Sequence, residues 1–364
     1  MRPPVFLTGA TGFLGMEVLA RLLERGDRDV ICLVRASDEP EAQKRLDGVL
    51  SRLWDEPAPY RARARAVAGD VTRPGLGMDG RLRTELAEDV GAVLHCAASI
   101  TFDLPLEEAR EINVEGTREV IGFAREAQSL GRLTRFVHVS TAFVGGLHSG
   151  VFGEDQLDTG QGFRNTYERT KWEAEHVLAA AADLSPAIAR PSIVMGDSTT
   201  GWTPAFNVLY WPLRAYARGL FEKVPALPHG RVDVVTVDYV ADSLVALLDR
   251  EDTGVFNIVS GHDAVTVDEL LDLASTRFGR PKAELTAPGA DDNVGAGGVF
   301  LPYFEVRTVF DDARARALLE PQGIGQAPFA SCFGALMDYA DAVGWGKRAM
   351  TRDAARRRLL SAAA

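Results

Sequence analysis

The sequence predicts an α/β protein with a doubly wound parallel sheet and a smaller C-terminal lobe. Short apolar runs alternate with amphipathic stretches through the first half of the chain, the pattern of strands joined by helices. A glycine-rich turn directly follows the first run, and the alternation breaks after Gly196. At 364 residues, the chain is long enough for one large α/β unit with an added lobe.

The expected strands are short β-branched runs that end at loops, and the expected helices carry apolar residues at helical spacing. In the first helix Leu14, Val18 and Leu22 share one face, and Gly26 follows as a stop. The strands are expected at Val5–Gly9, Asp29–Arg35, Arg65–Val71, Gly91–Ser99, Arg135–Thr141 and Ser185–Val194. The helices are expected at Phe13–Arg25, Glu41–Trp54, Leu106–Ala127 and Tyr167–Ala182.

The second half is less regular. An aromatic stretch lies within 197–230, a strand, helix, strand pattern resumes over 232–261, and a helix is expected at Asp268–Phe278. The glycine-rich segment Pro288–Gly298 is interpreted as a loop rather than a lid. Because ligands of open α/β sheets bind beyond the strand C-termini, the irregular pieces are expected to cover that edge. The predicted division is 1–196 with 231–262 as the sheet domain, 197–230 with 263–345 as a substrate-binding lobe, and 346–364 as a basic tail.

Composition and charge exclude several classes of protein. Hydrophobic residues make up 46% and charged residues 25%, close to the globular average. No uninterrupted apolar run of about 18 residues occurs, and the N-terminus lacks a signal-peptide pattern, so neither a membrane span nor secretion is expected. Three scattered cysteines predict no disulfide framework and no metal site, which favours the cytoplasm. The net charge of −11 disfavours nucleic acid as a partner.

The charge is unevenly distributed along the chain. The last twenty residues hold six basic side chains and one acidic side chain. Such a tail can be a frayed helix, a homo-oligomer contact or a docking arm for an acidic partner. A solvated terminal helix is the favoured interpretation.

The glycine-rich turn predicts a dinucleotide site, as in Rossmann domains. Gly9 permits the chain reversal, Gly12 lets the backbone approach a pyrophosphate, and Gly15 lets the helix lie close to the strand. Free N–H groups at the helix start attract phosphates. The cofactor contacts expected in this turn are Thr8, Gly9, Thr11, Gly12, Phe13, Leu14 and Gly15.

The end of the second strand predicts which cofactor is bound. An acidic residue there usually holds a ribose 2′-hydroxyl, but this chain has Arg35 twenty positions after Gly15. An arginine can clamp a 2′-phosphate through paired N–H donors, so NADPH/NADP+ is favoured over NADH. Asp70 and Val71 are expected to flank the adenine, and the small Ala97 and Ala98 to let the cofactor pass.

A tyrosine and a lysine are placed for acid–base chemistry. Tyr167 and Lys171 are one helical turn apart and therefore on one side of a helix. A free phenol has a pKa near 10, so a nearby ammonium is needed to stabilise its phenolate at neutral pH. Tyr167 and Lys171 are also expected to contact the cofactor, the lysine through the nicotinamide ribose. Thr141 and Ser140 end the fifth strand and point to opposite faces. Thr141 is favoured as the hydroxyl donor to a substrate oxygen, with Ser140 as the alternative.

Three other reactive side chains lie on expected strands. Cys96 has no identified histidine base and is interpreted as a buried structural thiol. His95 and His138 are interpreted as core or cofactor-neighbouring residues rather than metal ligands.

Together these motifs resemble the extended short-chain dehydrogenase/reductase family, in particular its fatty acyl-CoA reductase and thioester reductase branch. The similar blocks, in order, are TGATGFLG, LVRASDEPEAQKRLDGVL, GDVTRPGLGM, VLHCAASITFDLPLEEAREINVEGT, FVHVSTAFV, YERTKWEAE, ARPSIVMGD and VDVVTVDYVAD. The resemblance implies Thr141, Tyr167 and Lys171 as catalytic residues. It further implies that Asn113 supports the lysine. Pro191, Ser192 and Ile193 are implied to lie beside the nicotinamide.

The resemblance implies an NADPH-dependent reductase of an acyl thioester carried by coenzyme A or by an acyl or peptidyl carrier protein. The product is an aldehyde, and whether reduction continues to the alcohol is left open. The alternatives are an alcohol dehydrogenase or ketoreductase, or a nucleotide-sugar epimerase, acting on a free small molecule. A dinucleotide-sensing module without turnover is a further alternative. The aromatic stretch Phe206–Phe221 either lines an acyl channel or packs the lobe.

Overall fold

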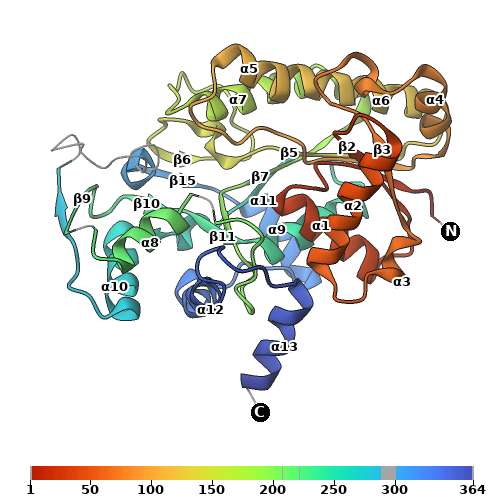
Figure 1. Cartoon of the computed structure of the whole chain (residues 1–364). Helices are drawn as coiled ribbons and strands as arrows, with labels where there is room; N and C mark the ends of the chain where they lie inside the picture. Colours follow the sequence, from red (N-terminus) through yellow and green to blue (C-terminus); the bar gives the residue numbers. More distant parts are fainter. Residues whose placement is uncertain (1, 207, 221, 288–300, 363–364) are drawn as a thin grey trace.

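A computed structural model describes residues 2–206, 208–220, 222–287 and 301–362 (Figure 1). The glycine-rich segment Pro288–Gly298 lies outside these residues. Within them, no helix combines the length and the hydropathy that crossing a lipid bilayer requires.

The main sheet has seven parallel strands in the order β12-β7-β5-β4-β1-β2-β3. Their bounds are β1 Val5–Thr8, β2 Val30–Val34, β3 Ala64–Ala68, β4 Ala92–His95, β5 Arg135–Val139, β7 Ala187–Pro191 and β12 Gly254–Ile258. From β1 the chain winds to β2 and β3 on one side and to β4 and β5 on the other. The ligand crevice of such a sheet lies where the winding reverses, beyond the carboxyl ends of β1 and β4.

Helices cover both faces of this sheet, so the doubly wound fold class is confirmed. In Figure 1, α4, α6 and α7 lie above the sheet and α1, α2 and α9 below it. Their bounds are α1 Phe13–Arg25, α2 Glu39–Leu53, α4 Gly80–Asp89, α6 Gly116–Ser129, α7 Thr166–Ala179 and α9 Val237–Leu248, with the short α3 Ala58–Arg61 after α2.

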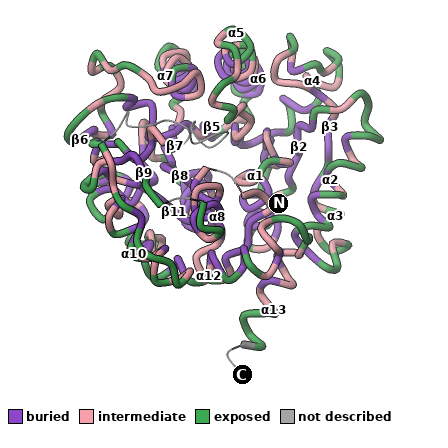
Figure 2. Tube along the Cα trace, turned by 60° about the vertical axis from the view of Figure 1, so that its left-hand side comes forward, coloured by how far each residue is buried: buried purple, intermediate pink, exposed green. Residues whose placement is uncertain are grey.

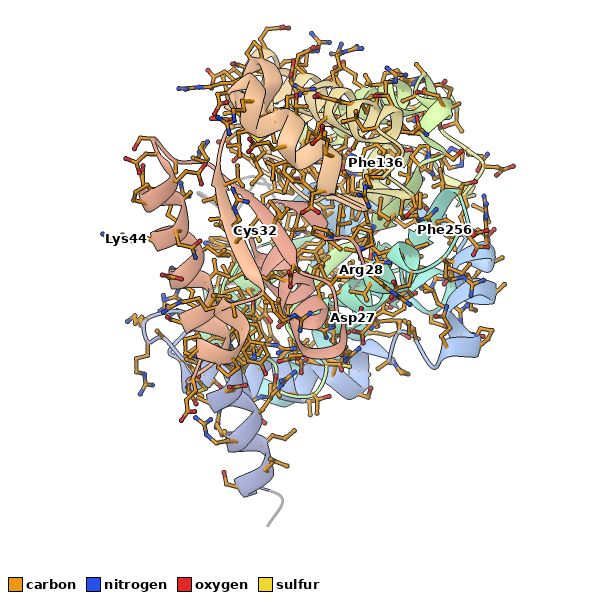
Figure 3. The ribbon with its side chains drawn as sticks, turned by 90° about the vertical axis from the view of Figure 1, so that its right-hand side faces the viewer. Asp27, Arg28, Cys32, Lys44, Phe136 and Phe256 are labelled. Carbon is orange, nitrogen blue, oxygen red and sulfur yellow. The ribbon has the colours of Figure 1, made fainter. Side chains whose placement is uncertain are left out.

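Successive side chains of each strand point to opposite faces of the sheet and pack into two separate hydrophobic cores. On β1, Val5 and Leu7 belong to the core with α1, whereas Phe6 faces α6, where its ring lies 4.5 Å from that of Phe123. Figure 3 shows Cys32 and Phe136 inside the sheet layers and Lys44 pointing outward from α2.

One strand of the sheet differs from the sequence expectation. The expected strand Ser185–Val194 divides at Ser192: β7 stays in the main sheet, and β8 (Ile193–Met195) pairs with β11 (Val234–Thr236) outside it. The seventh strand, β12, falls in the strand, helix, strand pattern expected over 232–261 and pairs with β7. A proline at the end of β7 has no N–H to donate, which is consistent with the chain leaving the sheet there.

The expected helix Leu106–Ala127 is continuous in direction but not regular. It consists of α5 (Leu106–Arg110), one π-helical turn (Glu111–Glu115) and α6. Single π turns inside α-helices often mark functional sites. Asn113 lies in this turn.

A second lobe with its own apolar core stands at the left of Figure 1. It contains α8 Tyr210–Ala217, α10 Val267–Phe278 and α12 Phe329–Ala342, with the strand pairs β9–β14 (Lys223–Pro225, Glu284–Thr286), β10–β13 (Arg231–Val232, Val265–Thr266) and β6–β15 (Gly150–Phe152, Thr308–Phe310). Although α11 (Ala313–Leu319) falls in the stretch assigned to this lobe, its Ala315 and Leu319 belong to the core of the sheet domain.

The basic tail forms α13 (Arg352–Ala362), which extends from the bottom of the molecule in Figure 1 and is exposed toward its end in Figure 2. Its first residue is not solvated, which corrects the expectation for this position. The Arg352 side chain is 2% exposed and forms ion pairs of 2.9 Å with Glu17 and 2.7 Å with Glu24. Both carboxylates belong to α1, so the tail is held by the acidic side of the helix that follows the glycine-rich turn.

Candidate active site

The glycine-rich turn packs so tightly that side chains would not fit. Gly9 has φ of +76°, and a Cβ there would lie 2.7 Å from the Ala97 amide nitrogen. A Cβ on Gly15 would lie 2.0 Å from the Gly9 carbonyl oxygen. Gly12 caps α1 without a side-chain hydrogen bond, so the helix begins with its N–H groups facing the turn.

A groove runs from this turn along the carboxyl ends of β2, β3 and β4. It brings together most of the residues predicted to bind the cofactor, while Phe13, Leu14 and Gly15 form the first turn of α1 behind it. The predicted residues that line the groove are Thr8, Gly9, Thr11, Gly12, Arg35, Asp70, Val71, Ala97 and Ala98. The groove can take a dinucleotide, because Gly9 and Gly12 leave the backbone of the turn uncovered by side chains.

Two further arginines lie at the end of this groove and were not predicted from the sequence. Arg45 of α2 and Arg73 share a hollow with Arg35. The guanidinium of Arg45 donates a hydrogen bond to the Arg35 carbonyl oxygen. In the sequence, these arginines are recognisable only as basic residues in the region of the second and third strands, which does not specify where their side chains point.

Helix α7 carries Tyr167 and Lys171 in its first two turns. Asn165 caps the helix by accepting a hydrogen bond from the Glu168 amide at 2.9 Å. The Lys171 side chain is buried, and its Nζ donates to the Val139 carbonyl oxygen at 2.8 Å. Burial lowers the pKa of Lys171 to about 8.

Thr141 and Tyr167 meet at the carboxyl end of β5. Burial raises the pKa of Tyr167 to about 12, and a hydrogen bond with Thr141 acts in the opposite direction. The Thr141 hydroxyl donates to the Pro191 carbonyl oxygen at 3.2 Å, which places the end of β7 beside this pair. The structure therefore brings together three of the residues predicted for the reaction site.

Ser140 points away from this pair. Its hydroxyl donates to the Glu175 carboxylate, which also forms a 2.6 Å ion pair with Arg190. All three side chains are buried. Ser140 thus belongs to a polar cluster beneath the site rather than to the site surface.

Asn113 and the segment after Pro191 occupy supporting positions. The Asn113 amide donates to Thr170 at 2.9 Å and to the Ser99 carbonyl oxygen at 3.1 Å, and its own oxygen accepts from the Ser99 amide. It therefore holds the residue before Lys171, not the lysine itself. Ser192 is buried, and Ile193 begins β8.

Tyr303, from the second lobe, also lies near the reaction site and was not predicted. Its hydroxyl accepts a hydrogen bond from Asn165 at 2.9 Å and is hydrogen-bonded to Glu168. Its ring stacks on Phe102 at 5.3 Å, and Phe102 in turn lies 5.9 Å from the Tyr167 ring. Tyr303 lies in a segment that resembles the family only faintly, and its hydrogen-bond partners are more than 130 residues away in the sequence.

The described part of the aromatic stretch Phe206–Phe221 packs within the second lobe, which is one of its two expected roles, and some of its residues also line an apolar pocket. Phe206 packs against Tyr210, Tyr339 and Trp345. Five other residues of the stretch line an apolar pocket in the second lobe: Leu209, Trp211, Pro212, Leu213 and Tyr216. Leu301 and Phe304, on either side of Tyr303 in the sequence, line the same pocket.

His95 is buried, whereas Cys96 is partly exposed and lines the groove. Burial raises the pKa of the Cys96 thiol to about 12, which keeps it protonated and unreactive. Burial also lowers the pKa of His95 to about 3, so its ring is neutral, and it shares hydrogen bonds with Thr8 at 2.7 Å and Thr117 at 3.3 Å.

A family model described as male sterility protein, of an NAD-binding type, matches residues 7–244. A protein of the linear gramicidin synthase of Brevibacillus parabrevis is 35% identical over 253 residues, which cover 66% of this chain and 5% of that protein. Fatty acyl-CoA reductase wat of Drosophila melanogaster is 32% identical over 282 residues, covering 66% of this chain and 53% of that protein. The chain thus spans about half or less of these relatives.

Among solved structures, the terminal R domain from the myxalamid PKS-NRPS biosynthetic pathway superimposes with a TM-score of 0.82 at 26% identity. The match covers 95% of this chain and 92% of that domain. It includes the second lobe as well as the sheet domain.

Proposed function

Because this chain belongs to the male sterility protein family, in the thioester reductase branch of the extended short-chain dehydrogenases/reductases, we propose that it is an NADPH-dependent reductase of acyl thioesters. The observation that carries the proposal is the contact of Thr141 with Tyr167 at the carboxyl end of β5, one helical turn from the buried Lys171.

The proposed cofactor is NADPH, which when bound supplies a hydride to the substrate carbonyl carbon. The glycine turn and the start of α1 would hold the pyrophosphate. Arg35, Arg45 and Arg73 supply positive charge in one hollow, which suits a 2′-phosphate better than a bare hydroxyl.

The residues of the chain have separate tasks in this reaction. As negative charge grows on the thioester oxygen, Tyr167 donates its proton there, and the Thr141 hydroxyl turns from the Pro191 carbonyl oxygen to donate a hydrogen bond to the same oxygen. The Lys171 ammonium stabilises the phenolate that remains. The resulting hemithioacetal breaks its C–S bond, so the products are an aldehyde and a thiol that takes up the hydroxyl proton.

The proposed substrate is an acyl group on coenzyme A or on a carrier protein. The first possibility is supported by the similarity to a fatty acyl-CoA reductase, and the second by the similarity to the R domain of a PKS-NRPS pathway. Reduction on to the alcohol would require a second hydride.

The function is tested by following NADPH oxidation with acyl-CoAs, acyl carrier proteins, ketones and sugar nucleotides. We expect turnover with thioesters and release of free thiol. The Tyr167→Phe variant should lose about 10²–10⁴-fold in kcat while still binding NADPH. Turnover of ketones or sugar nucleotides alone would overturn the thioester proposal, and equal activity of the variant would remove Tyr167 from the mechanism.

The cofactor preference is tested separately by comparing NADPH with NADH. Arg35→Ala and Arg45→Ala should each weaken NADPH binding by about 10-fold or more and leave NADH binding nearly unchanged. Lys44→Ala is the matched control, because this neighbouring side chain is exposed and points outward (Figure 3). A wild-type protein that prefers NADH would contradict the assignment.

A further inference from the structure

His138 lies on β5 and faces Lys171 in the interior of the sheet domain. The Lys171 Nζ lies 3.2 Å from His138 Nε2, in addition to its 2.8 Å hydrogen bond to the Val139 carbonyl oxygen. The His138 side chain is fully buried. None of the steps proposed above uses this histidine.

The chemistry of the contact decides which group donates. An ammonium has three N–H donors and no acceptor, so Nε2 must accept and the ring must be neutral with its proton on Nδ1. Burial, with the neighbouring Lys171 charge, lowers the pKa of His138 well below its usual value, consistent with that neutral form.

Lys171 is the hydrogen-bond partner of the His138 side chain. Among the described residues, its Nδ1 has no hydrogen-bond partner, so Lys171 is the group that its side chain engages. The neighbouring His95, whose ring lies 5.0 Å away, has its own partners in Thr8 and Thr117.

We propose that His138 is a positioning residue for the reductase reaction: it and the Val139 carbonyl oxygen occupy two N–H groups of Lys171 and direct the third toward the reaction site. This inference rests on the proposed function and adds a residue to it. A lysine side chain has four rotatable bonds, and two fixed acceptors hold its ammonium in one orientation.

The hydrogen bond accepted by His138 Nε2 also affects the pKa of Lys171. The titratable groups around the ammonium are Glu175 from the same helix, Cys96 after β4, His95 and His138 from the sheet, and Tyr167 one turn away. Burial disfavours the ammonium, whereas a hydrogen bond to a neutral acceptor favours it. Loss of the acceptor should therefore lower the pKa of Lys171.

Two substitutions separate positioning from packing. The amide oxygen of His138→Gln reaches the place of Nε2, whereas the shorter His138→Asn reaches only the place of Nδ1. We expect His138→Asn to lower kcat about 10-fold with little change in the KM for NADPH, and His138→Gln to retain most of the activity. The alkaline limb of the pH–rate profile should move to lower pH only in the Asn variant.

A second readout does not depend on turnover. The pKa of Lys171 Nζ, followed by ¹⁵N NMR of the full chain, should fall in His138→Asn and stay near the wild-type value in His138→Gln. Equal loss of activity in both variants, or an unchanged lysine pKa in the Asn variant, would overturn the positioning role. A wild-type protein inactive on every thioester would contradict the proposed function but not this pKa difference.

Discussion

At the scale of single residues, Thr141 and Ser140 are neighbours whose hydroxyls have different surroundings. Thr141 lies with Tyr167 and Pro191 at the sheet edge, whereas Ser140 donates to the buried Glu175. Because successive side chains of a strand point to opposite faces, the Thr141 hydroxyl lies on the substrate side and the Ser140 hydroxyl reaches a buried ion pair.

These positions predict opposite phenotypes. Thr141→Val should lower kcat by about 10²-fold with little change in stability, because it removes a donor to the developing negative charge. Ser140→Ala should cost about 1–3 kcal/mol of folding free energy, because a buried carboxylate loses a donor, and should leave kcat within about twofold. Steady-state kinetics and urea unfolding of both variants check this. A kcat loss confined to Ser140→Ala would reverse the assignment.

The charge of Lys171 predicts a pH dependence. Its pKa is lowered to about 8, so the ammonium loses its proton as the pH rises through that value. We expect kcat/KM, which reports on the free enzyme, to fall about tenfold per pH unit above about 8. The measurement is a pH–rate profile under conditions where circular dichroism shows an intact fold. A profile flat to about pH 10 would show that the lysine charge does not limit the reaction.

At the scale of elements, the start of α7 is held from two sides. Asn113 in the π turn bonds to Thr170, and Tyr303 from the second lobe bonds to Asn165 and Glu168. Tyr167 lies between Asn165 and Glu168, so the second lobe helps to position the helix turn that carries the phenol.

Removal of one hydroxyl tests this connection. Tyr303→Phe keeps the ring contacts but loses both hydrogen bonds, and we expect kcat to fall about 10-fold through misplacement of Tyr167. Tyr216→Phe is the matched control, because it also removes a buried phenol hydrogen bond of the second lobe, to the Pro281 carbonyl oxygen at 2.7 Å. The control should lose stability only. Similar kcat values for the two variants would exclude a role of Tyr303 in positioning.

At the scale of the whole molecule, the C-terminal helix is tied to the helix that begins at the cofactor turn. Arg352 pairs with Glu17 and Glu24, and the exposed Arg357 pairs with Asp55. Part of the positive charge near the C-terminus therefore pairs with acidic side chains of the same chain.

The two arginines of α13 should differ in their effect on stability. Arg352→Ala leaves the fully buried Glu17 without this partner, and we expect a loss of roughly 3–5 kcal/mol. Arg357→Ala removes an ion pair in which the arginine side chain is 61% exposed, and should cost less than about 1 kcal/mol. Chemical unfolding measures both. Equal losses would show that burial does not decide the strength of these pairs.

Much of the sheet domain could be predicted because its signals are local. Helix α1 begins and ends at the expected residues, and the glycine turn follows β1 as predicted, since these features depend on residues close in the chain. The residue at which the strand Ser185–Val194 divides was less predictable. A continuous apolar run did not reveal that the chain leaves the sheet at Ser192.

The sequence by itself determined the fold class, the place of the dinucleotide turn and the spacing of Tyr167 and Lys171. The fold class follows from the order of strand and helix patterns along the chain, and the other two depend on backbone geometry over a few residues. Only the tertiary structure decided that Arg45 joins Arg35, that Tyr303 reaches α7 and that Arg352 is buried against α1. The physical reason is that these side chains contact residues of distant segments, and the periodicity of the sequence does not indicate which distant segments pack together.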